Sequence, residues 1–127
     1  MRVLAVALLV ALATGFHPAT GDLAVTVEAR PIARSCSIAS TGTIVTYDAG
    51  VAHAVTYRFV RSDGSVSPTG RVWIGGDGAV AQSVRNVWTP KGPTPWVAFE
   101  VTSPEHVRST HAPVTAPCPR TALAAAR

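Results

Sequence analysis

Two arginines and two tryptophans are the side chains in this 127-residue sequence that are best suited to binding a ligand. Arg58 and Arg61 precede Asp63 in the stretch "AVTYRFVRSDGS", where they could contact an anionic ligand or a partner. The interpretation we favour is that both arginines are outward charges on a strand and that Asp63 belongs to its turn. Trp73 and Trp96 flank predicted turns and could offer flat faces to sugar rings, although packing on each other or on strand edges is favoured.

Catalytic and metal-binding motifs are missing from the sequence. It contains no Gly-x-Ser-x-Gly, no His-Glu-x-x-His and no paired carboxylates, and its seven acidic residues are scattered singly. Asp48, Asp63 and Asp77 never form the Asp-x-Asp pattern of a calcium loop. We therefore expect a protein that is not an enzyme and that carries no cofactor or metal.

The first 21 residues have the pattern of a secretory signal peptide. Arg2 is followed by the apolar run "VLAVALLVALATGF" and then by small and polar residues. The run is too short to span a membrane, which takes about 20 apolar residues. Cleavage after Gly21 is favoured over Ala13 or Gly15, and no second apolar span follows. We therefore predict a secreted, extracellular protein.

The mature chain is long enough for one domain, predicted to cover residues 22–118, with a frayed tail at 119–127. Without Arg2 the chain carries ten basic and seven acidic residues, a net charge of +3. Its basic residues are mostly arginines spread along the sequence, so a nucleic-acid footprint is not supported.

The mature chain contains two cysteines, Cys36 and Cys118. An even number in an exported chain predicts one disulfide. On the chain-entropy model, closing a loop of about 80 residues stabilises the fold by about 4 kcal/mol. Metal ligation is the weaker alternative, because there is no Cys-x-x-Cys and the histidines at 53, 106 and 111 lack ligand spacing.

Period-two hydrophobic patterns separated by turn residues predict about seven short strands and an antiparallel β-sandwich. The predicted strands cover residues 23–31, 36–47, 54–62, 66–74, 79–88, 96–103 and 112–118. On the third of these, Val55, Tyr57 and Phe59 are expected on one face, while Arg58 shares the other face with its neighbours at 56 and 60.

Turn residues and strand faces give more detailed expectations. Asp63-Gly64 predicts a tight type I′ hairpin, and Pro68 indicates that the returning strand lies at an edge. Val80, Val84 and Trp88 are expected to share one face. On the strand 96–103, Val97, Phe99 and Val101 are expected on the face opposite Trp96, Ala98 and Glu100.

The motifs "CSIASTGTI", "VTYRFVRSDG", "VRNVW" and "WVAFEVTSP" resemble an immunoglobulin-like domain of actinobacterial secreted proteins, a family that is largely uncharacterised. The resemblance covers nearly the whole mature chain in the same order. The matching residues are Cys36, Gly42, Ile44, Val55, Tyr57, Arg58, Arg61, Ser62, Asp63, Gly64, Val84, Trp88, Trp96, Ser103, Pro104 and Cys118.

The resemblance implies an Ig-like sandwich of about seven strands and a Cys36–Cys118 bridge. This sequence departs from the family pattern at Phe59, where a tryptophan is usual, and at "DAGVAH", which replaces a Gly-Pro-Gly turn. The strand Trp96–Ser103 contains no cysteine, so the implied bridge differs from the disulfide of antibody domains.

Together these observations predict a secreted, non-enzymatic Ig-like protein with a binding role, whose partner is an unknown protein or glycan at the cell exterior. The main alternative is a carbohydrate or cell-wall binding module that uses Trp73 and Trp96. A carrier of a small hydrophobic ligand is a third possibility. We expect a monomer without a membrane span.

Overall fold

The computed structural model describes residues 22–76 and 78–115 of the chain. The predicted signal peptide, Cys118 and the predicted tail lie outside the described residues. Within them the chain forms eight strands and no helix. The strands are β1 (Leu23–Pro31), β2 (Ile38–Thr46), β3 (His53–Arg61), β4 (Gly70–Ile74), β5 (Ala81–Trp88), β6 (Trp96–Ser103), β7 (Val107–Arg108) and β8 (Ala112–Pro113).

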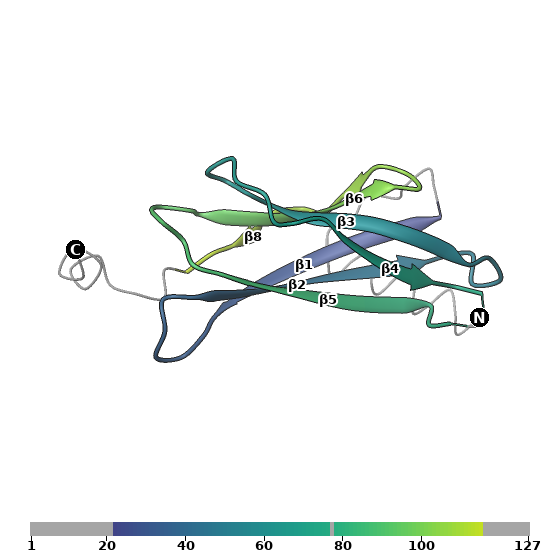
Figure 1. The fold of residues 1–127 in the computed structure, drawn as a ribbon, viewed down its shortest axis with the longest axis horizontal. Coiled ribbons are helices and arrows are strands. Elements are labelled where there is room, and N and C mark those ends of the chain that lie inside the picture. The colour runs from purple at the N-terminus through teal and green to yellow at the C-terminus, as the bar shows by residue number, and fades with distance from the viewer. Residues whose placement is uncertain (1–21, 77, 116–127) are drawn as a thin grey trace.

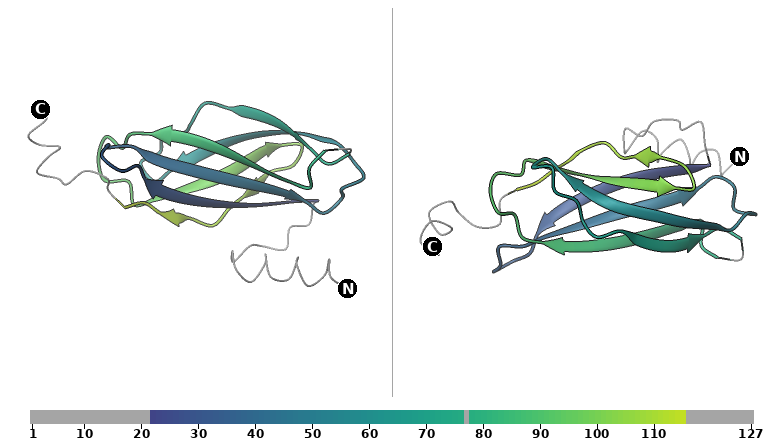
Figure 2. Two further views of the ribbon diagram at one scale, coloured as in Figure 1. Left: turned by 90° about the horizontal axis from the view of Figure 1, so that it is seen from below. Right: turned by 45° about the horizontal axis from the view of Figure 1, so that its top comes forward.

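The strands form two antiparallel sheets that pack face to face (Figures 1 and 2). One sheet has three strands in the order β1-β2-β5, and the other has the order β4-β3-β6-β7, with β8 also paired to β6. This architecture confirms the prediction of an all-β sandwich. The short strand β7 was not predicted, and β8 covers only the start of the predicted last strand.

The alternation of buried and exposed positions explains why these segments form strands. Along β2 every second residue from Ile38 to Thr46 is buried, which matches the period of two of a strand with one face in the core. The core lies between the two sheets, and the rings of Phe59 and Phe99 meet at its centre with 4.9 Å between their centroids. Gly42 lies against Phe99, and a Cβ at that position would overlap with the ring.

Trp88 belongs to this core, as its position in the sequence pattern predicted. Its side chain is buried, and its indole nitrogen donates a 2.8 Å hydrogen bond to the Ser40 hydroxyl. Val84 packs at the edge of the core, but Val80, which was expected on the same face, does not reach it. Val80 lies just before β5 begins, at the end of the sandwich, where its carbonyl still accepts the Thr46 amide at 2.9 Å but its side chain is exposed.

The hairpin between β3 and β4 turns differently from the predicted type I′ form. Its amide–carbonyl bonds join Arg61 to Ser65 and Gly64 to Arg61, which leaves a three-residue loop. Of the loop residues only Gly64 has a positive φ, at 89°. A type I turn followed by a glycine in the left-handed region has this geometry, and it needs one glycine where type I′ needs two permissive positions. As predicted, β4 is an edge strand.

Two buried serines extend the sheet beyond the Phe59–Phe99 pair. Ser67 donates its amide to the carbonyl of Phe59 and accepts the Phe59 amide on its hydroxyl at 2.8 Å. Ser109 makes the same two bonds with Phe99, also with 2.8 Å between the Phe99 nitrogen and the serine hydroxyl. We call these two residues the serine clamps. They pair with the backbone of Phe59 in β3 and Phe99 in β6, at positions beyond the ends of the neighbouring strands β4 and β7.

Candidate functional site

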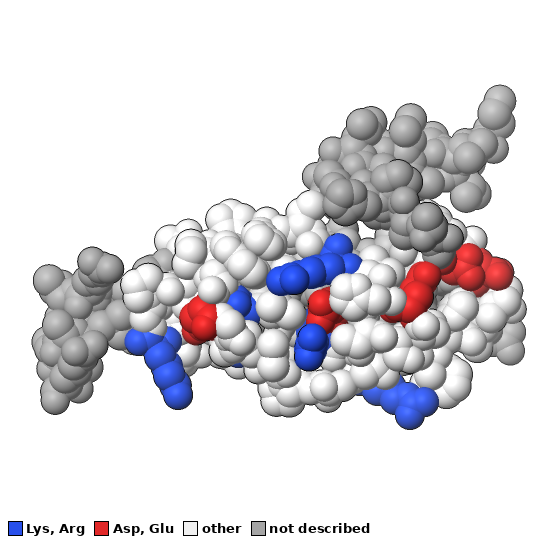
Figure 3. All heavy atoms as spheres, turned by 90° about the horizontal axis from the view of Figure 1, so that it is seen from above, with Lys and Arg blue, Asp and Glu red and all other residues white. Residues whose placement is uncertain are grey.

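The outer surface of the sheet β4-β3-β6-β7 gathers most of the side chains that the sequence singled out. Because side chains alternate along a strand, the neighbours of the core residues Phe59, Ile74 and Phe99 point away from the core. We call this surface the Arg–Trp face. Figure 3 shows the side of the molecule on which it lies. It is formed by Arg58, Arg71, Trp73, Trp96, Glu100 and Arg108.

Of the four predicted binding residues, Arg58, Trp73 and Trp96 lie on this face, and Arg61 does not. The expectation that Arg61 points outward is wrong, because it lies two residues after the inward-facing Phe59. Its guanidinium stands 4.5 Å above the Trp88 ring and donates a 2.9 Å hydrogen bond to the side-chain oxygen of Asn86. Burial lowers the pKa of Arg61, partly offset by Asp63. Arg61 therefore closes one end of the sandwich interior.

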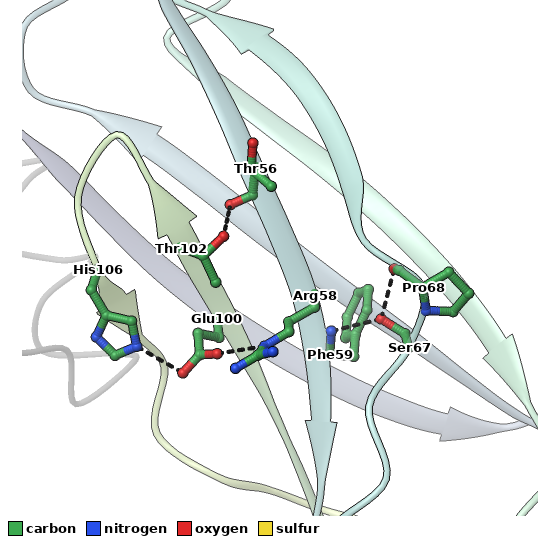
Figure 4. A network of polar contacts seen from close by, with 8 residues as sticks. All are labelled: Thr56, Arg58, Phe59, Ser67, Pro68, Glu100, Thr102 and His106. Carbon is green, nitrogen blue, oxygen red and sulfur yellow. Dashed lines mark hydrogen bonds and ion pairs between the residues drawn. The ribbon is translucent and has the colours of Figure 1, made fainter.

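A buried carboxylate occupies the middle of the Arg–Trp face (Figure 4). The Glu100 side chain is only 6% exposed, and each of its oxygens has a partner. Arg58 Nε donates to Oε1 at 2.7 Å, and His106 Nε2 lies 2.8 Å from Oε2. Burial raises the pKa of Glu100, but the hydrogen bonds from His106 and Arg58 outweigh burial, and the net shift is downward.

An aromatic stack stands next to this carboxylate on the same face. The rings of Trp96 and His111 are nearly parallel, at 8°, with 3.6 Å between their centroids. The Arg108 guanidinium lies 5.8 Å from the centroid of the Trp96 ring, within the range of a cation–π contact. Arg108 is also paired in register with Glu100. The stack and the carboxylate network therefore form one continuous cluster.

Trp73 lies at the opposite end of the sheet from Trp96. It is the most exposed large hydrophobic side chain described, at 65%, and it is paired with Ala54 near the start of β3. Trp96, in contrast, bonds through its carbonyl to Ser62, just past the end of β3. At about 3.3 Å per residue, this separates the two tryptophans by about 26 Å along the sheet. They do not pack on each other and do not form one compact platform.

The outer surface of the other sheet has a different chemistry. Its three strands present Thr26, Thr43 and Ser83 side by side across the sheet, and the last two share a 3.0 Å hydrogen bond between their hydroxyls. Glu28 and Arg30 form an exposed ion pair there, and Arg85 is exposed. We call this surface the threonine face. It contains no aromatic side chain in β1, β2 or β5, so the two surfaces are clearly distinguished.

Sequence reasoning missed several members of the cluster. Glu100 was placed on the correct side of its strand, but nothing indicated that it would be buried or paired. The histidines at 106 and 111 and Arg108 follow β6 closely, and the structure folds them back over it. The available signal was a single acidic residue inside the apolar strand "WVAFEVTS", since such a carboxylate needs a cationic partner nearby.

Two classes of site can be assessed within the described residues. No three His, Cys, Asp or Glu side chains there gather closely enough to hold a metal ion. The same part of the chain contains no helix that is long and apolar enough to cross a membrane.

Comparison with known proteins adds no assignment to this geometry. No protein-family model, curated protein or solved structure matches the chain.

Proposed function

We propose that this protein is a secreted, Ig-like, non-enzymatic binding domain that recognises a partner through the Arg–Trp face. The observation that carries the proposal is the segregation of the two surfaces. Both tryptophans outside the core share one sheet surface with three arginines, whereas the threonine face has no aromatic side chain and carries mainly hydroxyl and small apolar side chains with Arg30 and Arg85. Tryptophan and arginine contribute most strongly to the binding energy of protein interfaces.

Charge supports the same surface. The strands of the Arg–Trp face carry Arg58, Arg71 and Arg108 against the single acidic residue Glu100, which is already paired. A surface of this kind attracts an acidic partner and rejects a basic one.

Capture from the culture medium of the producing organism tests this proposal. We expect the immobilised mature chain to retain a partner and soluble mature chain to compete it off. The double variant Trp73→Ala/Arg108→Gln should retain much less, because both side chains are exposed and the fold does not depend on them. Retention of nothing beyond what a heat-unfolded control retains would contradict the proposal.

The second candidate is a carbohydrate or cell-wall binding module, and the 65% exposure of Trp73 favours it. The separation of Trp73 from Trp96 means that such a module would contact an extended chain rather than one sugar ring. A polysaccharide ligand should shift the tryptophan emission of the wild type and leave Trp73→Ala unchanged. Flat titrations over many glycans would count against this candidate.

We further propose that a Cys36–Cys118 disulfide closes the sandwich. Cys36 lies in the connection between β1 and β2, and its neighbour Ser37 bonds Thr89 through their hydroxyls at 3.0 Å. The Val114 amide bonds the Pro95 carbonyl, at the far end of the same β5–β6 connection. The last described residues therefore leave the sandwich at the end where Cys36 lies.

A thiol assay on the unfolded, unreduced mature chain tests the bridge. We expect no reactive thiol, and reduction should destabilise the fold by about 4 kcal/mol on the chain-entropy model. Two reactive thiols per chain would contradict the bridge.

A further inference from the structure

We infer that the Trp96 end of the Arg–Trp face binds a carboxylate-rich peptide segment of a partner protein, with Arg108 and Arg58 as its anion contacts. This inference rests on the proposed function and adds the chemistry of the partner.

The first argument is that guanidinium donors on this face are unused. Glu100 is the only acidic residue on the strands of the face, and Arg58 and His106 occupy its two oxygens. Arg58 uses its Nε for this bond, and its two terminal nitrogens have no partner within the described residues. Arg108 likewise forms no ion pair with any described carboxylate. These planar donors match a carboxylate, which accepts two parallel hydrogen bonds from a guanidinium.

The second argument is that both guanidinium groups are held in place before a ligand arrives. Arg58 is fixed through Nε by a carboxylate that is itself buried. Arg108 rests against Trp96, and the Trp96 ring is restrained by its stack on His111. A site that is already ordered loses less side-chain entropy on binding, which favours affinity.

The third argument separates a peptide from a glycan. Sugar hydroxyls need hydrogen-bond acceptors as well as donors, but most of the polar groups that this cluster leaves unused are guanidinium donors, beside imidazole nitrogens of His106 and His111 that donate or accept according to their tautomer. The single carboxylate is buried and fully paired, and the nearby Thr102 hydroxyl already donates to the Thr56 carbonyl. A donor-rich surface beside an aromatic stack suits acidic side chains that are flanked by peptide groups.

Amide NMR on the isotope-labelled mature chain, titrated with an oligoglutamate peptide, tests the inference. We expect shift changes at the Trp96 indole and at residues around Arg108, with affinity that falls as salt is raised. Arg108→Gln should weaken binding about tenfold, since a hydrogen bond between charged groups is lost. The matched variant Arg85→Gln, which removes an exposed arginine from the threonine face, should bind as the wild type does, and oligoglutamine should not bind.

Three results would overturn the inference. One is an absence of shift changes at the Trp96 end, and another is equal weakening by Arg85→Gln and Arg108→Gln, which would indicate unspecific charge attraction. The third is binding of alginate, a carboxylated polysaccharide, where oligoglutamate fails. If a captured partner is lost in Trp73→Ala/Arg108→Gln while oligoglutamate does not bind, the proposed function stands and this inference fails.

Discussion

Glu100 holds together the centre of the Arg–Trp face. Its carboxylate is buried, and it is tolerated there because Arg58 and His106 supply one partner to each oxygen. The side chains of Arg58 and His106 are exposed, so the network connects solvent-exposed groups to β6, the strand that also carries Phe99. The same network orients the Arg58 guanidinium that we assign to ligand binding.

The downward pKa shift of Glu100 predicts an acid-sensitive contribution to stability. The pKa in the folded protein lies below the ordinary value of 4.5, because hydrogen bonds from His106 and Arg58 outweigh the opposing effect of burial. The contribution is therefore fully present above the unfolded pKa and is lost as the pH falls through the folded pKa. Glu100→Gln should flatten the acid side of a plot of unfolding free energy against pH.

Glu28→Gln is the matched control for this prediction, since Glu28 belongs to an exposed ion pair with Arg30 at 3.5 Å. It should leave the acid side of the plot unchanged. An acid slope in Glu100→Gln as steep as that of the wild type would contradict the role given to Glu100.

At the residue scale, the sequence predicted on which face of a strand a side chain lies better than it predicted the burial and partners of that side chain. Alternation placed Arg58 and Glu100 correctly on the outer face, because that pattern depends only on the strand. The same alternation puts Arg61 on the inward face with Phe59, but we expected it to point outward because of its charge. The cation is tolerated inside because Trp88 and Asn86 lie on the other sheet, and a single sequence does not show which strands face each other.

At the scale of elements, the serine clamps predict a measurable cost for losing one hydroxyl. In Ser67→Ala the amide of Phe59 stays buried and loses its acceptor, the Ser67 hydroxyl (Figure 4). We expect the free energy of unfolding to fall by about 1–3 kcal/mol in urea denaturation, with Ser109→Ala behaving alike. Ser83→Ala removes a hydroxyl on the exposed threonine face and should change stability by less than about 0.5 kcal/mol. Equal effects in all three variants would contradict the clamps.

Gly42 predicts a packing limit in the middle of β2. An alanine Cβ there would overlap with the Phe99 ring, which has little room to move at the centre of the core. Gly42→Ala should therefore lower the free energy of unfolding by about 1–3 kcal/mol. Gly92→Ala is the control, because its Cβ would meet nothing within 4 Å. A Gly42→Ala variant as stable as the control would show that the core adapts easily.

Element boundaries were largely predictable because most strands have one face in the core. The predictions for β1 and β6 match their observed bounds, and those for β2, β3 and β5 differ by no more than two residues at either end. The segment before β4 was harder to predict. After the turn, Val66 pairs only briefly with β3, and Ser67 then replaces regular pairing by its clamp. A period-two pattern does not distinguish a clamp residue from a strand residue.

At the scale of the whole molecule, the two outer surfaces differ in chemistry, and the proposed division into a structural and a binding surface rests on that difference. The threonine face carries mostly β-branched and hydroxyl side chains that suit an exposed sheet, together with Arg30 and Arg85, whereas only the Arg–Trp face combines arginines with tryptophans, a combination typical of recognition. The sequence alone did not predict this separation, since Trp73 and Trp96 come from strands that are not adjacent, β4 and β6. Only the order β4-β3-β6-β7 places them on one surface, and 26 Å apart by the estimate of about 3.3 Å per residue.

The most direct test of the account is a capture experiment that compares the two faces in one protein. Trp73→Ala/Arg108→Gln alters the Arg–Trp face, and Thr43→Ala/Arg85→Gln makes a matched pair of changes on the threonine face. Both variants should fold with melting temperatures close to that of the wild type, because each change is at or near the surface. We predict that the first variant loses the captured partner and that the second retains it at the level of the wild type. Equal retention by both variants, or loss only in the second, would contradict the assignment of binding to the Arg–Trp face.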